Sequence, residues 1–353
     1  MKHFRFSLIF TAICLALGFW WGLEHGSMRI ALSTLAVVAI LAVMEVSLSF
    51  DNAVVNASIL KHWDHFWKTL FLTVGMLVAV FGMRLVFPLL IVAMTANMGL
   101  VEVAQLALNN PKLYSAKLLE HHAEISAFGG MFLLLVFLNF LLDADKDVHW
   151  FDWLEQKFSK LGRSGTASTL VALLILIGAL QWVSQADQLA VFMAGIWGIV
   201  VYQAVSLLSS ILEGEGEDDP ELGKAIQRGG VAGFVYLEVL DASFSFDGVI
   251  GAFAITNDVV VIMLGLAIGA MFVRSMTIYL VDKGTLDEFI YLEHGAHYAI
   301  GALAIIMLAS MQLHIPELVT GFIGVAFIGW SLWASIRHRK QHHKDQHKDH
   351  LAG

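Results

Sequence analysis

The stretch "AVMEVSLSFDNAVV", residues 42–55, decides the fold class, because it sets Glu45 and Asp51 within an apolar run long enough to cross a lipid bilayer. A charged side chain at the centre of a bilayer costs at least about 2.5 kcal/mol, so acids in such positions usually serve a function. Ser47 and Ser49 stand between the two acids. The stretch therefore predicts a membrane-spanning helix that carries a polar site.

The composition of the whole chain agrees with a membrane protein. Of its 353 residues 58% are hydrophobic and 14% are charged, whereas a soluble chain carries about a quarter charged residues. The apolar residues gather into about ten blocks, and we expect each to be a helix, since an isolated spanning strand cannot satisfy its backbone in lipid. The blocks cover residues 6–23, 30–55, 69–95, 125–142, 168–185, 188–211, 231–256, 259–281, 296–313 and 316–335. The sequence thus predicts an all-α, polytopic membrane protein.

The distribution of charge predicts how the chain lies in the membrane. With the N-terminus in the cytoplasm, only three of the 21 Lys and Arg fall on external segments and two within spans; all the others are cytoplasmic. Both termini are then cytoplasmic. The first span is expected to stay uncleaved, because Trp20 and Trp21 stand where a signal peptidase needs small residues.

Other features of the sequence exclude several classes of protein. The formal net charge of −9 comes mainly from acidic loops such as "EGEGEDDPE", residues 213–221, which we interpret as solvated linkers, so we expect no nucleic-acid partner. Cys14 is the only cysteine, which excludes an intramolecular disulfide and a thiolate metal cluster.

The opening motif occurs twice. In "VLDASFSFDGVI", residues 239–250, Asp241 stands where the first copy has Glu45, and Asp247 stands where it has Asp51. The shared pattern is acid-x-Ser-x-Ser-Phe-Asp. Two later stretches repeat in the same order: "GMLVAVFGMR" as "GLAIGAMFVR", and "EHHAE" as "EHGAH". These matches predict the duplication of a three-helix unit.

The two units are expected to run in opposite directions, because five spans separate equivalent helices. Inverted repeats of this kind are typical of secondary transporters, in which equivalent residues meet near the membrane midplane. The predicted organisation is a first span with its external loop (1–29), repeat one (30–145), linker spans with an acidic cytoplasmic loop (146–229), repeat two (230–313), a last span (314–336) and a His-rich basic cytoplasmic tail (337–353). We interpret the tail as a solvated anchor in preference to a weak metal sensor.

Carboxylates interleaved with hydroxyls suit a hard or borderline divalent cation such as magnesium, calcium or manganese. On a regular helix Glu45 and Asp51 point about 120 degrees apart. One ion can therefore take both only if the helix breaks near "SFDN", or if the second acid comes from the other repeat. We expect the second arrangement, with Asp51 and Asp247 as the central pair.

Less specific interpretations stay open for the surrounding residues. A buried serine often bonds the carbonyl four residues back, and a buried acid can be protonated or paired with arginine. Arg84 and Arg274 are either gating partners of the acids or side chains that reach the interface from a span end. The supporting residues predicted for the site are Ser47, Ser49, Ser243, Ser245, Glu238, Arg84 and Arg274. A peripheral ion-access site is a further candidate, against ordinary polar residues at helix starts: Glu120, His121, Glu124, Glu293, His294 and His297.

"EVSLSFDNAVV" resembles the Glu-x-x-Leu-Ser-x-Asp-Asn signature of the TerC family of bacterial integral membrane proteins. "EVLDASFSFDGVIGAFAIT" resembles a TerC-related group long catalogued as a domain of unknown function, and the likeness covers about residues 30–310. It implies a bacterial inner-membrane protein of the broader LysE-like exporter group, whose TerC members are linked to manganese export and, by name, to tellurite resistance. The ion-binding positions it implies are Glu45, Asp51, Asn52, Asp241 and Asp247. Gly248 replaces Asn52 in the second copy, which makes the two halves chemically unequal.

The sequence therefore predicts a transporter that exports a divalent metal ion, with manganese as the first candidate. We expect it to work by alternating access, with protonation of the acids as the coupling step. We expect no enzyme activity and no resident cofactor; the partners are the lipid bilayer and the transported cation, and no oligomeric state follows. One alternative is a non-transporting partner that delivers metal to exported enzymes. Another is a membrane-embedded hydrolase using His121, His122 and Glu124, although the sequence lacks a His-Glu-x-x-His motif there.

Overall fold

The computed structural model describes residues 3–352 except 97, 144–147, 152, 154, 156, 158–165, 214–228, 284–288 and 314. The side chains of residues 94, 95, 209–213, 246, 247, 254, 317, 318 and 341–352 also lie outside the description. Within the described residues all regular structure is helical and no strand occurs, so the all-α prediction is confirmed.

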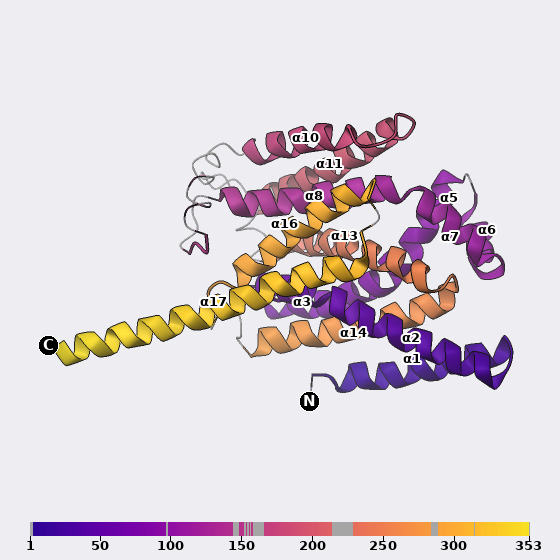
Figure 1. The fold of residues 1–353 in the computed structure, drawn as a ribbon, viewed down its shortest axis with the longest axis horizontal. Helices are drawn as coiled ribbons and strands as arrows, with labels where there is room; N and C mark the ends of the chain where they lie inside the picture. The colour runs from indigo at the N-terminus through magenta and orange to yellow at the C-terminus, as the bar shows by residue number, and fades with distance from the viewer. Residues whose placement is uncertain are drawn as a thin grey trace.

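The helices lie broadly along one axis of the molecule, and the C-terminal helix extends beyond the bundle (Figure 1). In chain order they are α1 (Arg5–Glu24), α2 (Met28–Leu48), α3 (Phe50–Leu60), α4 (His65–Leu70), the π-helices η1 (Phe71–Gly75) and η2 (Val78–Val86), α5 (Phe87–Thr95), α6 (Leu100–Asn109), α7 (Pro111–Glu120), α8 (His122–Leu142), α10 (Ala167–Leu180), α11 (Gln188–Glu213), α13 (Val231–Ile255), α14 (Val259–Asp282), α16 (Leu292–Ser310) and α17 (Glu317–Ala352).

Eight helical segments of the described chain are long and apolar enough to cross a membrane. They are Arg5–Glu24, Met28–Leu48, His65–Ala93, His122–Leu142, Gln188–Leu208, Val259–Asp282, Leu292–Ser310 and Val319–Lys340. Two of the ten predicted spans are not among them. The fifth falls on α10, which has 14 residues, and the seventh on α13, whose 25 residues include three acids. The chain is thus a polytopic membrane protein.

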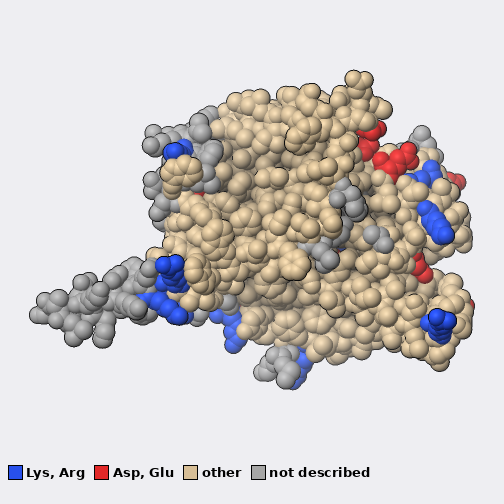
Figure 2. Space-filling model, in the orientation of Figure 1, with Lys and Arg blue, Asp and Glu red and all other residues tan. Residues whose placement is uncertain are grey.

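The exterior of the bundle is apolar where a bilayer would surround it. Ile9 on α1, Leu174 on α10 and Phe322 on α17 are 61%, 60% and 72% exposed. On the face in Figure 2, the charged residues that are described lie at the right-hand end and along the left and lower margins, and the broad middle is almost free of them. An apolar surface this extensive is a place for lipid or protein contact. The interior centres on α8, which packs chiefly against α11 and α16.

The first copy of the motif lies at a break between two helices. Helix α2 ends at Leu48 and α3 begins at Phe50, with Ser49 between them at φ −100° and ψ 17°. The carboxylate of Asp51 accepts a hydrogen bond from the N–H of Asn52 (3.0 Å). Such local side-chain bonds compete with helix formation. The second copy differs, because α13 runs unbroken through its motif.

The third span contains an unusual amount of π-helix. Its two π segments, η1 and η2, together cover most of residues 71–86. Both intramembrane arginines bind carbonyl groups of this stretch: Arg84 Nη1 donates to Ala79 O (2.8 Å), and Arg274 Nε donates to Leu72 O (2.6 Å). Because π-helical segments are rare and often lie at functional sites, this span is expected to serve more than packing.

Candidate functional site

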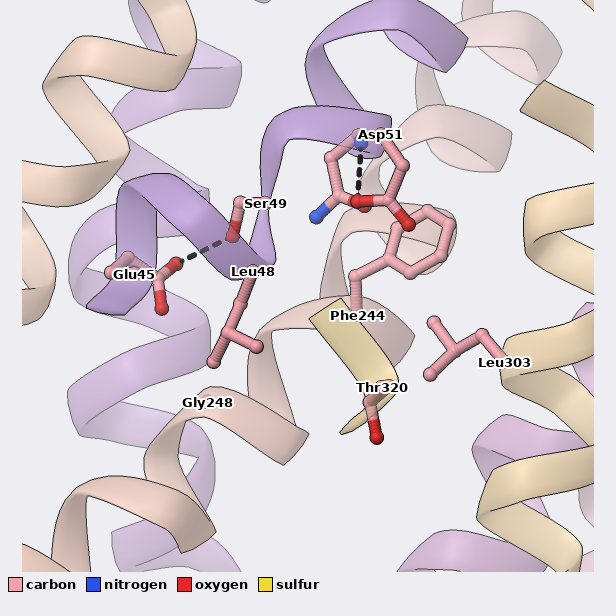
Figure 3. A pocket seen from close by; sticks show the side chains of 9 residues that line it. Glu45, Leu48, Ser49, Asp51, Phe244, Gly248, Leu303 and Thr320 are labelled. Atoms are coloured by element: carbon pink, nitrogen blue, oxygen red, sulfur yellow. Dashed lines mark hydrogen bonds between the residues drawn. The ribbon is translucent and has the colours of Figure 1, made fainter. Parts of the chain in front are cut away.

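A small cavity lies at the break between α2 and α3, inside the bundle. Its volume is about 20 Å³, enough for about one water molecule or one unhydrated ion. Figure 3 shows Glu45 and Asp51 on the two sides of the break, with residues of α13, α16 and α17 closing the space. The lining residues are Glu45, Leu48, Ser49, Asp51, Asn52, Phe244, Gly248, Leu303 and Thr320.

Glu45 is the most deeply buried of the cavity acids, with 1% of its surface exposed. Its Oε1 accepts hydrogen bonds from Ser49 Oγ (3.0 Å) and from Arg84 Nη2, with which it forms an ion pair. Glycines surround its other side: a Cβ placed on Gly248 would stand 2.7 Å from Oε2, and one on Gly269 would overlap Cβ and Cγ. The chain thus leaves space for this one carboxylate.

This packing predicts the effect of a methyl group at Gly269. A Cβ there would overlap Glu45 and lie 3.3 Å from Ala42 O, so α2 and α14 would have to separate. We expect Gly269→Ala to lower the free energy of unfolding by about 1 to 3 kcal/mol, the usual cost of overpacking. Thermal unfolding of the purified protein in detergent measures this effect.

Gly178→Ala is the matched control, because a Cβ on this helical glycine would meet nothing within 4 Å. Alanine favours a helix over glycine by roughly 0.5 to 1 kcal/mol, so the control is expected to match or exceed the parent in stability. Equal melting temperatures for Gly269→Ala and the parent would contradict the close packing of α14 on Glu45.

Asp51 is 7% exposed, and its two oxygens have different surroundings. Oδ1 accepts the N–H of Asn52, while Oδ2 faces α17, where a Cβ on Gly324 would stand 2.9 Å away. The neighbouring Asn52 is 6% exposed, and its Oδ1 has no hydrogen-bond partner among the described residues. Asp51 and Asn52, at the start of one helix, therefore both bring to the cavity side-chain oxygens that can ligate a cation.

The second copy of the motif contributes Asp241, which is 8% exposed. Its Oδ1 accepts a hydrogen bond from Asn56 Nδ2 (3.0 Å), so α3 and α13 are joined by side chains 185 positions apart. Asp241 also lies within electrostatic range of Glu45 and Arg84. Sequence reasoning did not find Asn56; the only signal was an amide within an apolar run, five residues after Asp51.

Four further predicted site residues divide into three groups. Ser245 is buried, and Ser243 is buried with its hydroxyl donating to Val239 O (2.9 Å). Ser47 is exposed on the outside of α2 and donates to Val43 O (2.8 Å), so it does not reach the cavity. The side chain of Asp247 lies outside the described residues, so its expected pairing with Asp51 stays a prediction.

The six residues predicted for an access site do not come together. His121 pairs with Glu124 (3.1 Å) at the N-terminal end of α8, and Glu120 is exposed beside them. At the other end of α8, His297 stacks on Phe140 with ring centroids 3.9 Å apart. A helix of 21 residues is about 30 Å long, so these are two places.

The second of these places includes Val148 and Glu155, which the sequence did not indicate. His297 Nδ1 lies 2.9 Å from Glu293 O, and His294 Nε2 donates to Val148 O (2.9 Å) and lies 3.5 Å from Glu155 Oε2. No group of three or more His, Cys, Asp or Glu suited to a metal occurs in the part of the chain that is described.

A cluster of acids inside a membrane bundle needs positive charge near it. Glu45, Asp51 and Asp241 are all at least nine-tenths buried, and Arg84 is the one described cation that pairs with any of them. Buried carboxylates without a counter-charge are costly, so such acids are protonated, paired with a cationic side chain or bound to a cation. The arrangement can therefore bind a cation through oxygen atoms.

The architecture and the site define an all-helical polytopic membrane protein with buried acids at a broken helix. The chain belongs to the family described as "Protein of unknown function (DUF475)", whose model matches residues 50–342. No curated protein matches the chain, and no solved structure matches it. The family description assigns no activity, and the resemblance to TerC stays an interpretation of the motif.

Proposed function

We propose that the protein is a transporter that exports a divalent cation across the bacterial inner membrane. Manganese is the first candidate for this cation. The observation that carries the proposal is the cavity at the helix break, which Glu45 and Asp51 border from opposite sides. At the break, the fixed angle that a regular helix imposes on these two acids no longer applies. The proposed site has one small cation bound by both carboxylates.

The chemistry of the lining favours a hard or borderline cation. Carboxylate, amide and hydroxyl oxygens are present at Glu45, Asp51, Asn52 and Ser49, and none of the described lining residues contains sulfur. Such oxygen sets suit magnesium, calcium and manganese. The Oδ1 of Asn52, which has no hydrogen-bond partner among the described residues, is a neutral ligand atom that a cation would satisfy. We put manganese first because of the TerC-like motif.

The proposal includes ten spans and an inverted repeat with alternating access. It is supported by the contact of Asn56 with Asp241, since these residues come from the two copies of the unit. It is also supported by the broken helix α2–α3, because discontinuous helices form the binding sites of many transporters built from inverted repeats.

Arg84 has a defined part in this proposal. Its guanidinium binds Glu45, so one of the two cavity acids is already neutralised. A divalent cation that binds Glu45 through Oε1 competes with Arg84 for that oxygen. The guanidinium of Arg84 then keeps a hydrogen-bond partner in the π-helical backbone of η2, because its Nη1 already binds Ala79 O.

Transport by the purified protein alone tests the function. We expect vesicles that contain the full chain to take up Mn²⁺ down its gradient, at a rate well above that of protein-free vesicles, and cells that lack their own exporter to lose manganese when they produce it. Uptake is measured with a manganese-sensitive dye inside the vesicles.

The same test separates the alternatives. A non-transporting partner that delivers metal to exported enzymes would bind Mn²⁺ without moving it into vesicles. Absence of uptake for Mn²⁺, Mg²⁺ and Ca²⁺ in both membrane orientations would contradict the transporter proposal.

A further inference from the structure

Polar groups that the cavity does not use lie farther along α3 and α13. Asn56 is 2% exposed; its Nδ2 binds Asp241, and its Oδ1 has no hydrogen-bond partner among the described residues. The amide must have this orientation, because Oδ1 facing the carboxylate would set two acceptors against each other. Since both atoms belong to one planar amide, Oδ1 lies beside the Asp241 carboxylate and is free to accept.

Glu238 lies on the same face of α13 as Asp241, three residues earlier, and the two carboxylates interact electrostatically. Both oxygens of Glu238 are buried and neither has a hydrogen-bond partner within the described chain. Oε1 lies against Gly75 of η1, with the rings of Phe71 and Phe234 beside it. A buried carboxylate with apolar neighbours and no donor is expensive unless it is protonated or a cation comes to it.

These groups are displaced from the cavity toward one end of the bundle. Phe244, the cavity-lining residue of α13 nearest to Glu238, follows it by six residues, about 9 Å along a helix. Glu238 itself is about 10 Å from the start of α13. At this end of α13, Gly229 packs closely on Trp63: a Cβ on Gly229 would stand 2.9 Å from Trp63 Cγ. The distribution of Lys and Arg predicts that it faces the cytoplasm.

We propose that Asn56, Asp241 and Glu238 form an access station for a divalent cation, adjacent to the cavity but outside its lining, and nearer the end at Gly229. This inference rests on the proposed transport function. The station offers two carboxylates and an amide oxygen, which is an oxygen donor set for a hard divalent cation. A cation entering from that end meets Glu238 first, then Asp241 and Asn56, and reaches Glu45 and Asp51 last.

Binding stoichiometry tests the station directly. The full chain in lipid nanodiscs is titrated with Mn²⁺, and bound ion is counted from the electron paramagnetic resonance of free Mn²⁺. We expect two ions for the parent and one for Glu238→Gln. Asp51→Asn is also expected to bind one, and the double variant none. The ion that remains in each single variant shows that the protein is folded.

Transport kinetics give a second readout. In vesicles, Glu238→Gln is expected to raise the KM for Mn²⁺ offered from the Gly229 side about tenfold, a loss of about 1.4 kcal/mol in binding, with a much smaller change in maximal rate. Glu24→Gln, an exposed acid at the end of α1, is the matched control and is expected to keep the parent's KM.

The outcomes separate this inference from the proposed function. Transport by the parent together with an unchanged ion count and KM in Glu238→Gln overturns the station and leaves the transporter. A parent that binds a single ion also overturns it. Failure of the parent to bind or move Mn²⁺, Mg²⁺ or Ca²⁺ overturns both.

Discussion

Asp51→Asn is expected to lower the rate of Mn²⁺ transport at least about 100-fold, since even the loss of an outer partner of a metal site commonly costs 10- to 100-fold. Asparagine has nearly the same shape, and its Oδ1 can still accept the N–H of Asn52. The change therefore removes the negative charge and leaves the helix start at Phe50 in place. Initial rates of Mn²⁺ uptake into vesicles, at equal protein per vesicle, measure the effect.

Asp64→Asn is the matched control for this prediction. Asp64 is exposed at the start of α4, where its carboxylate accepts the N–H of Trp67 (2.9 Å). Asparagine caps a helix about as well as aspartate, so the control is expected to transport at the parent's rate. Parent-like transport by Asp51→Asn would mean that the cation does not use this carboxylate.

The apolar blocks of the sequence predict the class of fold because hydrophobic length is a local property. They do not predict where the motif helix breaks. Glycine is a weaker helix former than asparagine, so intrinsic propensity would put the break in the copy with Gly248. The structure has the opposite arrangement: α13 is continuous at Gly248, and the missing side chain there makes room for Glu45 of the other copy of the motif. Packing between distant segments overrides local propensity.

The part of the site that is repeated in both copies of the motif was predictable from the sequence. Duplication of the acids is visible in the sequence, and it pointed to Glu45, Asp51 and Asp241, which are buried together. Asn56 has no such signal, since its counterpart in the second copy is Ala252 and its partner lies 185 positions away. The π-helical run around Arg84 is equally hidden, because its residues form an ordinary apolar pattern.

Replacing Arg84 is expected to make the stability of the protein depend on divalent cation. Arg84→Gln leaves Glu45 buried without its counter-charge, and breaking a buried pair in this way costs about 3 to 5 kcal/mol. In a chelator the variant should therefore melt well below the parent. Mn²⁺ binding restores stability, by about 2.7 kcal/mol at 100 times the Kd. Thermal unfolding in detergent, with chelator or with Mn²⁺, measures both effects.

The charge of the Arg84–Glu45 pair explains why the response to Mn²⁺ should be larger in the variant than in the parent. In the parent a cation competes with the guanidinium for Glu45, whereas in Arg84→Gln this competitor is absent. Removing both members in Glu45→Gln/Arg84→Gln should restore stability in chelator and reduce the response to Mn²⁺. Arg29→Gln, at an exposed arginine, is expected to behave as the parent in every condition.

Two results would contradict this account of Arg84. Equal melting of Arg84→Gln and the parent in chelator would mean that the arginine does not hold Glu45. A variant that melts low and gains nothing from Mn²⁺ would mean that Glu45 is not a ligand of the cation. The pair would then be a structural contact between α2 and η2, and the search for the ion's ligands would move to Asp51 and Asp241.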